Sequence, residues 1–242
     1  MTLSWLPNAI TVVRCGLAFA CAFAVLAGEA LSRRLDTGLA QWRDAGSPAP
    51  SAADYPATLL DTAPGDLIFW PSLAFGFFVL AAVSDFADGA LARALDAASA
   101  FGAWLDPVAD KLLVGLTLVA LSVTGNALLL SVPAAVIISR DIYVTWLRAR
   151  QGGGLALPVM ATAKWKTALE MVAIALLLAL PLLAALLHVF GAPAPAGLGG
   201  LAVLATSEWL GIGLLWSAAA LSVWTGHKYR RAFHQGPAEE FG

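Results

Sequence analysis

The sequence predicts an all-α integral membrane protein with six transmembrane helices and a polar cavity that faces the cytoplasm. Hydrophobic residues make up 60% of the chain and charged residues only 12%, whereas soluble domains carry ~25% charged residues. The apolar residues fall in long blocks, each near the ~20 residues that cross a bilayer as a helix. Most Lys and Arg residues gather in segments that would lie on one side of the membrane; Arg33, Arg34 and Arg43 lie outside these segments, among a larger number of acids.

The first apolar block is expected to be an uncleaved helix, because it lacks a basic start and is long enough to span. It contains Cys15 and Cys21, which we expect to be small packing residues rather than a disulfide. It also contains Arg14, which either serves the site or extends to the membrane surface. All six blocks cover residues 6–27, 67–95, 103–123, 127–146, 163–187 and 199–225.

Basic residues predict the orientation. They lie where the second block leads into the third, at Arg93, between the fourth and fifth blocks, and in the C-terminal tail. These segments and both termini are therefore expected in the cytoplasm. Residues 29–66 would then form an external insertion in a single membrane domain covering 1–242. Its centre, 46–53, has the composition of a flexible linker, and 31–42 could form a short interfacial helix.

Four carboxylates stand where the second and third blocks meet the cytoplasm. Asp85 and Asp88 are three residues apart, and Asp106 and Asp110 are four apart, so each pair shares a helix face. Four acids aimed at one space would repel one another unless a cation were bound. Because all the ligands are oxygens, Mg²⁺ or Mn²⁺ is expected.

Small residues and one cation accompany these acids. Gly89, Ala92 and Gly102 leave room for a large ligand, and Arg93 could reach a phosphate. Together with a metal, they make a plausible diphosphate site. We expect Lys111 to point to another face of its helix.

Other classes of protein fit less well. The net charge of −2 suggests no nucleic-acid partner. Single acids at helix ends often only mark the membrane boundary, but four at this spacing are unusual. A cation transporter would need polar residues through the depth of several helices, whereas the third and sixth blocks have apolar middles.

The stretch 85–110 resembles the signature of CDP-alcohol phosphotransferases, D-x2-D-G-x2-A-R-x8-G-x3-D-x3-D, at every fixed position. The resemblance implies six transmembrane helices, a homodimer and a cytoplasmic cavity that binds a CDP-linked lipid. It implies that Asp110 is the general base and also a metal ligand. The other residues that match family positions are Asp85, Asp88 and Asp106 as metal ligands, and Asn8, Thr11, Gly89, Ala92, Arg93 and Gly102 around the CDP-lipid.

Three further segments, Leu6–Arg14, Ser139–Arg148 and Lys164–Met171, resemble those of bacterial phosphatidylglycerophosphate synthases in this family. The resemblance implies an inner-membrane enzyme that transfers the phosphatidyl group of CDP-diacylglycerol to glycerol 3-phosphate and releases CMP. The cations expected to bind the acceptor phosphate, or alternatively to anchor anionic lipid, are Arg140, Arg148, Lys164 and Lys166.

Some positions depart from this pattern. Asp141 stands where these synthases usually have Glu, and Glu170 where they have Gln. The segment Ile-Ser-Arg-Asp at 138–141 also resembles cardiolipin synthases that use phosphatidylglycerol as the acceptor, which remains the alternative.

Overall fold

A computed structural model shows six α-helices and describes residues 6–44, 64–95, 100–124, 127–150, 161–189 and 198–235, except for some side chains toward the helix ends. The prediction of an all-α chain is therefore confirmed for the described residues, and each predicted apolar block lies on one helix. The helices are α1 (Leu6–Asp44), α3 (Pro64–Leu95), α4 (Ala100–Val123), α5 (Ala127–Arg150), α6 (Ala161–Val189) and α7 (Leu198–Gln235).

The helix α1 is longer than its apolar block. Residues 31–42 do not form a separate helix, as the sequence suggested, but continue α1 without a break to Asp44. Good helix formers and the i,i+4 pair of Arg33 with Glu29, 2.8 Å apart, favour this continuation. Gly28 lets α1 pack closely on α3, because a Cβ there would lie 3.3 Å from the Cβ of Trp70. The predicted linker at 46–53 lies outside the described residues.

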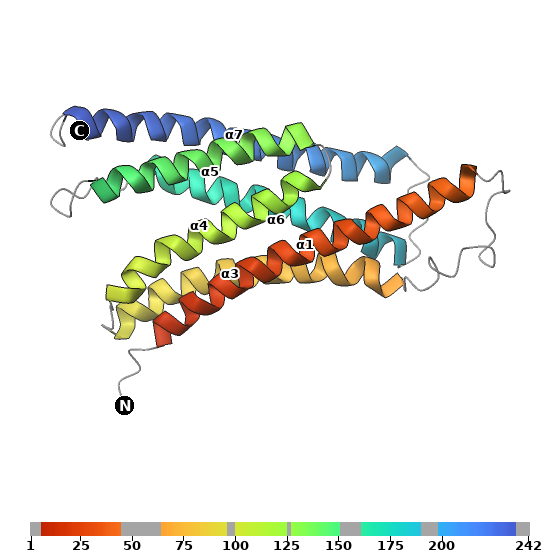
Figure 1. Ribbon diagram of the computed structural model, residues 1–242, viewed down its shortest axis with the longest axis horizontal. Coiled ribbons are helices and arrows are strands. Elements are labelled where there is room, and N and C mark those ends of the chain that lie inside the picture. Colours follow the sequence, from red (N-terminus) through yellow and green to blue (C-terminus); the bar gives the residue numbers. More distant parts are fainter. Residues whose placement is uncertain are drawn as a thin grey trace.

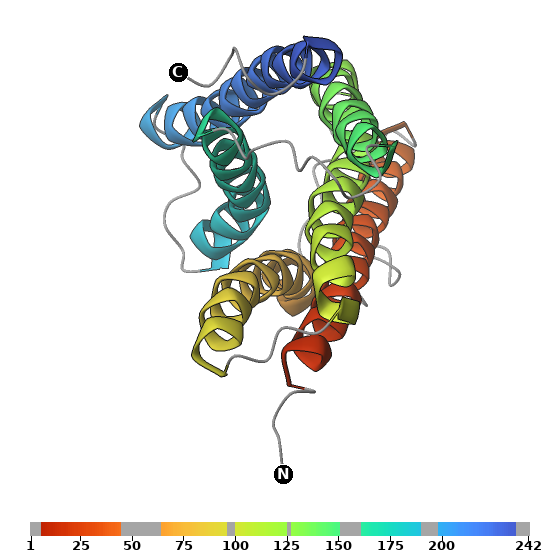
Figure 2. The ribbon, with the colours of Figure 1, turned by 90° about the vertical axis from the view of Figure 1, so that its left-hand side faces the viewer.

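The six helices form a closed ring. Each packs on two neighbours, in the order α1, α3, α6, α7, α5, α4 and back to α1, and Figure 2 shows this ring from one end. Small side chains permit the close approach of α1, α3 and α4. The Cys21 thiol, for example, lies 3.3 Å from the carbonyl oxygen of Ala74 and 3.6 Å from the hydroxyl of Thr117. Cys21 thus packs as expected, without a disulfide.

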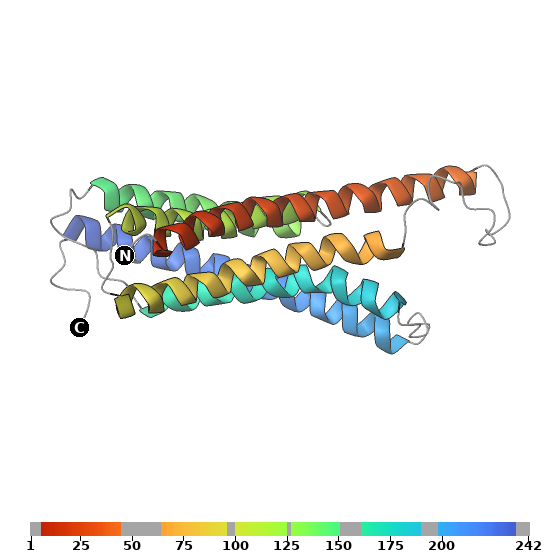
Figure 3. The same ribbon diagram turned by 90° about the horizontal axis from the view of Figure 1, so that it is seen from below.

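The direction of the helices alternates along the chain. The starts of α1, α4 and α6 and the ends of α3, α5 and α7 lie at one end of the bundle (Figure 1). We call this the terminal end. At the opposite end α1 extends past its neighbours (Figure 3). The acidic motif and the predicted acceptor cations therefore belong to the same half of the bundle.

Several helices have the length and composition of membrane spans. Among the described residues, Asn8–Arg34, Leu128–Leu147 and Glu208–Arg231 meet both requirements, and Phe69–Asp85 is a shorter apolar stretch. Large apolar side chains point outward on the ring, including Phe23 and Leu128. Exposed apolar surface on long helices is typical of contact with lipid. With 39 residues, α1 would be about 58 Å long, so it must extend beyond a ~30 Å hydrocarbon core.

Candidate active site

The first part of the site is formed by α1, α3 and α4 at the terminal end. Asp85, near the end of α3, pairs with Arg14 of α1, and the distance from Oδ1 to Nη1 is 2.5 Å. The Arg14 side chain is 1% exposed, whereas that of Asp85 is 52% exposed. Arg14 therefore does not extend to the membrane surface, which was one of its two expected roles. Its charge is buried and directed at the first acid of the motif.

Asp110 of α4 completes this group. Its half-buried carboxylate is close enough to interact electrostatically with Asp85, Asp141 and the cations Arg14 and Lys111. The structure thus brings together two of the four predicted acids from different helices. Both offer only oxygen atoms, and Asp85 is accessible, so this part of the donor set fits a hard divalent cation. Among the described side chains, no three metal-binding groups lie together.

Several predicted residues are placed only as positions in a helix. Asp88, Gly89, Ala92 and Arg93 belong to α3, while Gly102 and Asp106 belong to α4. Arg148 likewise belongs to α5 and Lys164 to α6. Their side chains are outside the described part of the chain. On α1, Thr11 is buried and Asn8 is half-buried, in the two turns before Arg14.

The second part of the site is a charged network that joins α4, α5 and α6. The Asp141 carboxylate on α5 accepts hydrogen bonds from Lys166 of α6 at 2.6 Å and from the neighbouring Arg140 at 2.9 Å. The amino group of Lys111 lies 3.5 Å from the backbone carbonyl oxygen of Asp141. Lys111 therefore reaches across to α5 and adds a cation to this network.

Lys166 and Glu170 form the most deeply buried pair of this network. They lie one turn apart on α6, with 2.9 Å between Nζ and Oε1, and their side chains are 3% and 2% exposed. Lys166 thus stands between two carboxylates, those of Asp141 and Glu170. Sequence reasoning treated Glu170 only as a departure from the family pattern, although its i,i+4 spacing from Lys166 was a signal for this pair.

Arg140 connects the network to α7. Its Nη2 donates a hydrogen bond of 2.8 Å to the hydroxyl of Thr225, and its guanidinium lies over the ring of Tyr229, 5.6 Å from the centroid. Gly226 makes room for this approach, because a Cβ there would lie 3.2 Å from Cγ of Arg140. No sequence pattern indicated Thr225 or Tyr229, which are 85 and 89 residues from Arg140 along the chain.

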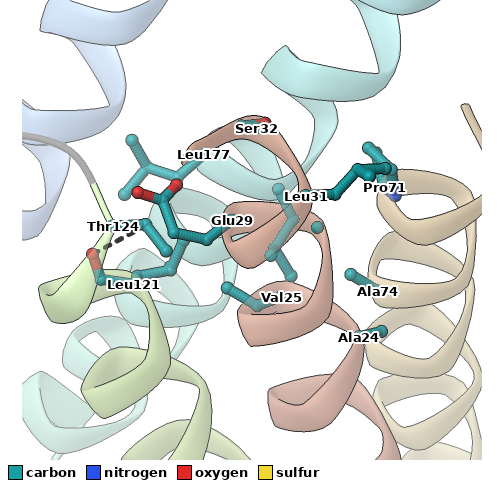
Figure 4. Close-up of a pocket in the computed structure, with 12 residues that line it drawn as sticks. Ala24, Val25, Glu29, Leu31, Ser32, Pro71, Ala74, Leu121, Thr124 and Leu177 are labelled. Carbon is teal, nitrogen blue, oxygen red and sulfur yellow. Dashed lines mark hydrogen bonds between the residues drawn. The ribbon is translucent and has the colours of Figure 1, made fainter. Parts of the chain in front are cut away.

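A separate pocket lies toward the opposite end of the bundle. It has a volume of about 160 Å³, and Figure 4 shows Glu29 and Thr124 at its edge beside apolar side chains such as Leu177. Arg33 of α1 connects to the end of α4 nearby, because its Nη2 donates a 2.7 Å hydrogen bond to the carbonyl oxygen of Val123. The charged groups of the motif are not part of this pocket.

Comparison with known proteins decides the family. The family model for CDP-alcohol phosphatidyltransferases matches residues 66–224. The chain belongs to the CDP-alcohol phosphatidyltransferase family. The matched region includes the four aspartates and the charged network of α4, α5 and α6. It begins after α1 and ends just before Thr225, so Arg14 on one side and Thr225 and Tyr229 on the other contact it from outside.

Two bacterial relatives are CDP-diacylglycerol–glycerol-3-phosphate 3-phosphatidyltransferases. The protein of Cereibacter sphaeroides is 38% identical over 181 residues, which cover 65% of this chain and 80% of that protein. The protein of Pseudomonas fluorescens is 46% identical over 116 residues, covering 45% and 57%. A cardiolipin synthase (CMP-forming) of Oryza sativa subsp. japonica is 37% identical over 169 residues, covering 64% and 46%.

Proposed function

We propose that this phosphatidyltransferase moves the phosphatidyl group of CDP-diacylglycerol to the primary hydroxyl of glycerol 3-phosphate, forming phosphatidylglycerophosphate and CMP. The observation that carries the proposal is the meeting of two parts at the terminal end: the motif acids Asp85 and Asp110, and the cationic network beside them. A transfer between two phosphate-bearing substrates needs both parts. The names of the bacterial relatives support the same reaction.

The acids would hold a divalent cation. We assign Asp85, Asp88, Asp106 and Asp110 to Mg²⁺ or Mn²⁺, which when bound would neutralise the carboxylates and polarise the diphosphate. Arg14 already supplies one positive charge to Asp85. Gly89, Ala92, Arg93 and Gly102 would face the CDP diphosphate, and Asn8 and Thr11 its nucleotide end.

The chain's own groups would then direct the transfer. Asp110 accepts the proton of the acceptor hydroxyl, whose oxygen forms the new bond to the lipid-linked phosphorus. The bond from that phosphorus to the CMP oxygen breaks, and CMP leaves with its electron pair. Arg140, Arg148, Lys164 and Lys166 bind the acceptor phosphate and hold the hydroxyl in line.

We further propose that all six helices cross the membrane, with both termini and the polar cavity in the cytoplasm. The alternation of the helices in Figure 1 supports an even number of crossings, and the basic residues at the terminal end support its orientation. The chain would form one membrane domain in the bacterial inner membrane, with its insertion outside, and would act as a homodimer.

The test is an acceptor panel. Purified protein is incubated with CDP-diacylglycerol, Mg²⁺ or Mn²⁺, and glycerol 3-phosphate, phosphatidylglycerol, serine or inositol phosphate in turn, and released CMP is measured. We expect release with glycerol 3-phosphate. Release only with phosphatidylglycerol would overturn the proposal and favour the activity of the Oryza relative, a cardiolipin synthase.

A further inference from the structure

The acceptor cations are partly neutralised by the protein itself. Lys166 lies 2.6 Å from Oδ1 of Asp141 and 2.9 Å from Oε1 of Glu170. A phosphate that binds Lys166 must therefore compete with two carboxylates. Such competition lowers the affinity for phosphate, because binding must weaken the hydrogen bond to Asp141 and the ion pair with Glu170.

The carboxylate of Glu170 changes the net charge of the network that would attract a phosphate. With every group ionised, the network contains three cations, Lys111, Arg140 and Lys166, and two carboxylates, Asp141 and Glu170, so its sum is 3 − 2 = +1. Removing the charge of Glu170 would raise it to +2. A phosphate monoester carries close to two negative charges at neutral pH, so it would be attracted more strongly to the network without Glu170.

The two carboxylates differ in what they hold together. Asp141 bonds to Lys166 on another helix and also to Arg140, so it fastens α5 to α6. The ion pair of Glu170 is with Lys166 on its own helix. Neutralising Glu170 therefore leaves the link between helices in place. Lys166 also keeps its ion pair with Asp141, so neutralising Glu170 leaves no buried cation without a partner and should cost little stability.

We propose that Glu170 determines the affinity for the acceptor phosphate by competing with it for Lys166. The inference rests on the proposed function and makes Glu170 a specificity-determining residue, not a catalytic one. It explains why a carboxylate that is 2% exposed stands beside a cation of the acceptor site. The Glu170 carboxylate would then lie beside the cation that binds the acceptor phosphate.

The test is Glu170→Gln, which keeps the size of the side chain and removes its charge. We expect the KM for glycerol 3-phosphate to fall by about tenfold, because one like charge is removed beside the phosphate. The KM for CDP-diacylglycerol and the melting temperature should change little. The matched control is Glu29→Gln, which neutralises another i,i+4 carboxylate, paired with Arg33 toward the opposite end, and should leave both KM values unchanged.

Inhibition by inorganic phosphate gives a second measurement that does not depend on the acceptor. Its inhibition constant should also fall by about tenfold in Glu170→Gln. An unchanged or higher constant in a folded variant would overturn the inference and make Glu170 only a structural partner of Lys166. If Glu170→Gln did not fold, Glu170→Asp, which withdraws the carboxylate by one methylene, should lower the constant in the same direction, and no fall there would overturn the inference too.

The two proposals fail in different ways. If the wild-type protein released CMP with phosphatidylglycerol but not with glycerol 3-phosphate, the proposed function would be wrong. Inhibition by inorganic phosphate would still test the competition for Lys166, because inorganic phosphate and glycerol 3-phosphate both present a phosphate group. If glycerol 3-phosphate were the acceptor and its KM did not respond to Glu170→Gln, only the inference about Glu170 would be wrong.

Discussion

The two described acids of the motif should respond in opposite ways to the same substitution. Asp85 faces the guanidinium of Arg14, which is buried on α1. Asp85→Asn keeps the shape of the side chain but removes the negative charge that faces this cation. Asp110 is half-buried and interacts with two like charges, Asp85 and Asp141. Asp110→Asn removes a source of repulsion in the absence of metal.

The magnitudes follow from burial. Removing one partner of a fully buried ion pair costs ~3–5 kcal/mol, but half of the Asp85 side chain is exposed, so we expect Asp85→Asn to cost about 2–3 kcal/mol. Asp110→Asn should stabilise the protein by about 0.5–1 kcal/mol, because it removes a half-buried charge that is repelled by Asp85 and Asp141 and that serves activity rather than stability. Glu29→Gln is the control, since its pair with Arg33 is exposed and on one helix, and it should stay within ~0.5 kcal/mol.

The assay is unfolding of the purified protein by SDS in mixed micelles with EDTA, followed by circular dichroism. The expected order of stability is Asp110→Asn, then the wild type and Glu29→Gln, then Asp85→Asn. Equal losses at Asp85 and Asp110 would contradict the different environments of the two carboxylates. A loss at Asp85 no larger than that at Glu29 would show that the pair with Arg14 contributes nothing.

Two further predictions concern the metal and the insertion. Activity should disappear in EDTA and return with Mg²⁺ or Mn²⁺. Asp110→Asn should lower turnover by ~10²–10⁴ while Mn²⁺ still binds. Asp88→Asn should instead weaken the binding of Mn²⁺. Titrations of Mn²⁺ on both variants check this, and a rate of Asp110→Asn that excess metal restores would make Asp110 chiefly a ligand. Deleting residues 46–53 should leave turnover nearly unchanged, because they lie far along the chain from the motif; a large loss with folding preserved would show that the insertion serves the site.

Much of the fold could be predicted because hydrophobic blocks mark each helix. The length of α1 could not be predicted in this way. Charged residues such as Glu29 and Arg33 end the apolar block, but they do not end a helix, and their i,i+4 pair supports it. Hydropathy therefore locates the part of a helix that fits a membrane, and helix propensity decides how far the helix continues.

The sequence predicted which residues belong to the candidate site, but not which of them pair with each other. The acids and cations follow from spacing and from family resemblance. Arg14 meets Asp85 across 71 residues and Asp141 meets Lys166 across 25, and such pairs depend on how the ring of helices closes. Glu170 is the exception, because its spacing from Lys166 on one helix made the pair visible in the sequence.

The most direct test of the central claim follows the acceptor into the product. Purified protein in micelles with CDP-diacylglycerol and Mg²⁺ is given deuterated glycerol 3-phosphate, and the lipid extract is analysed by mass spectrometry. We expect labelled phosphatidylglycerophosphate in an amount equal to the CMP released. With Asp110→Asn, both products should form only at the reduced rate of that variant. CMP released without label in the lipid fraction would contradict transfer to glycerol 3-phosphate.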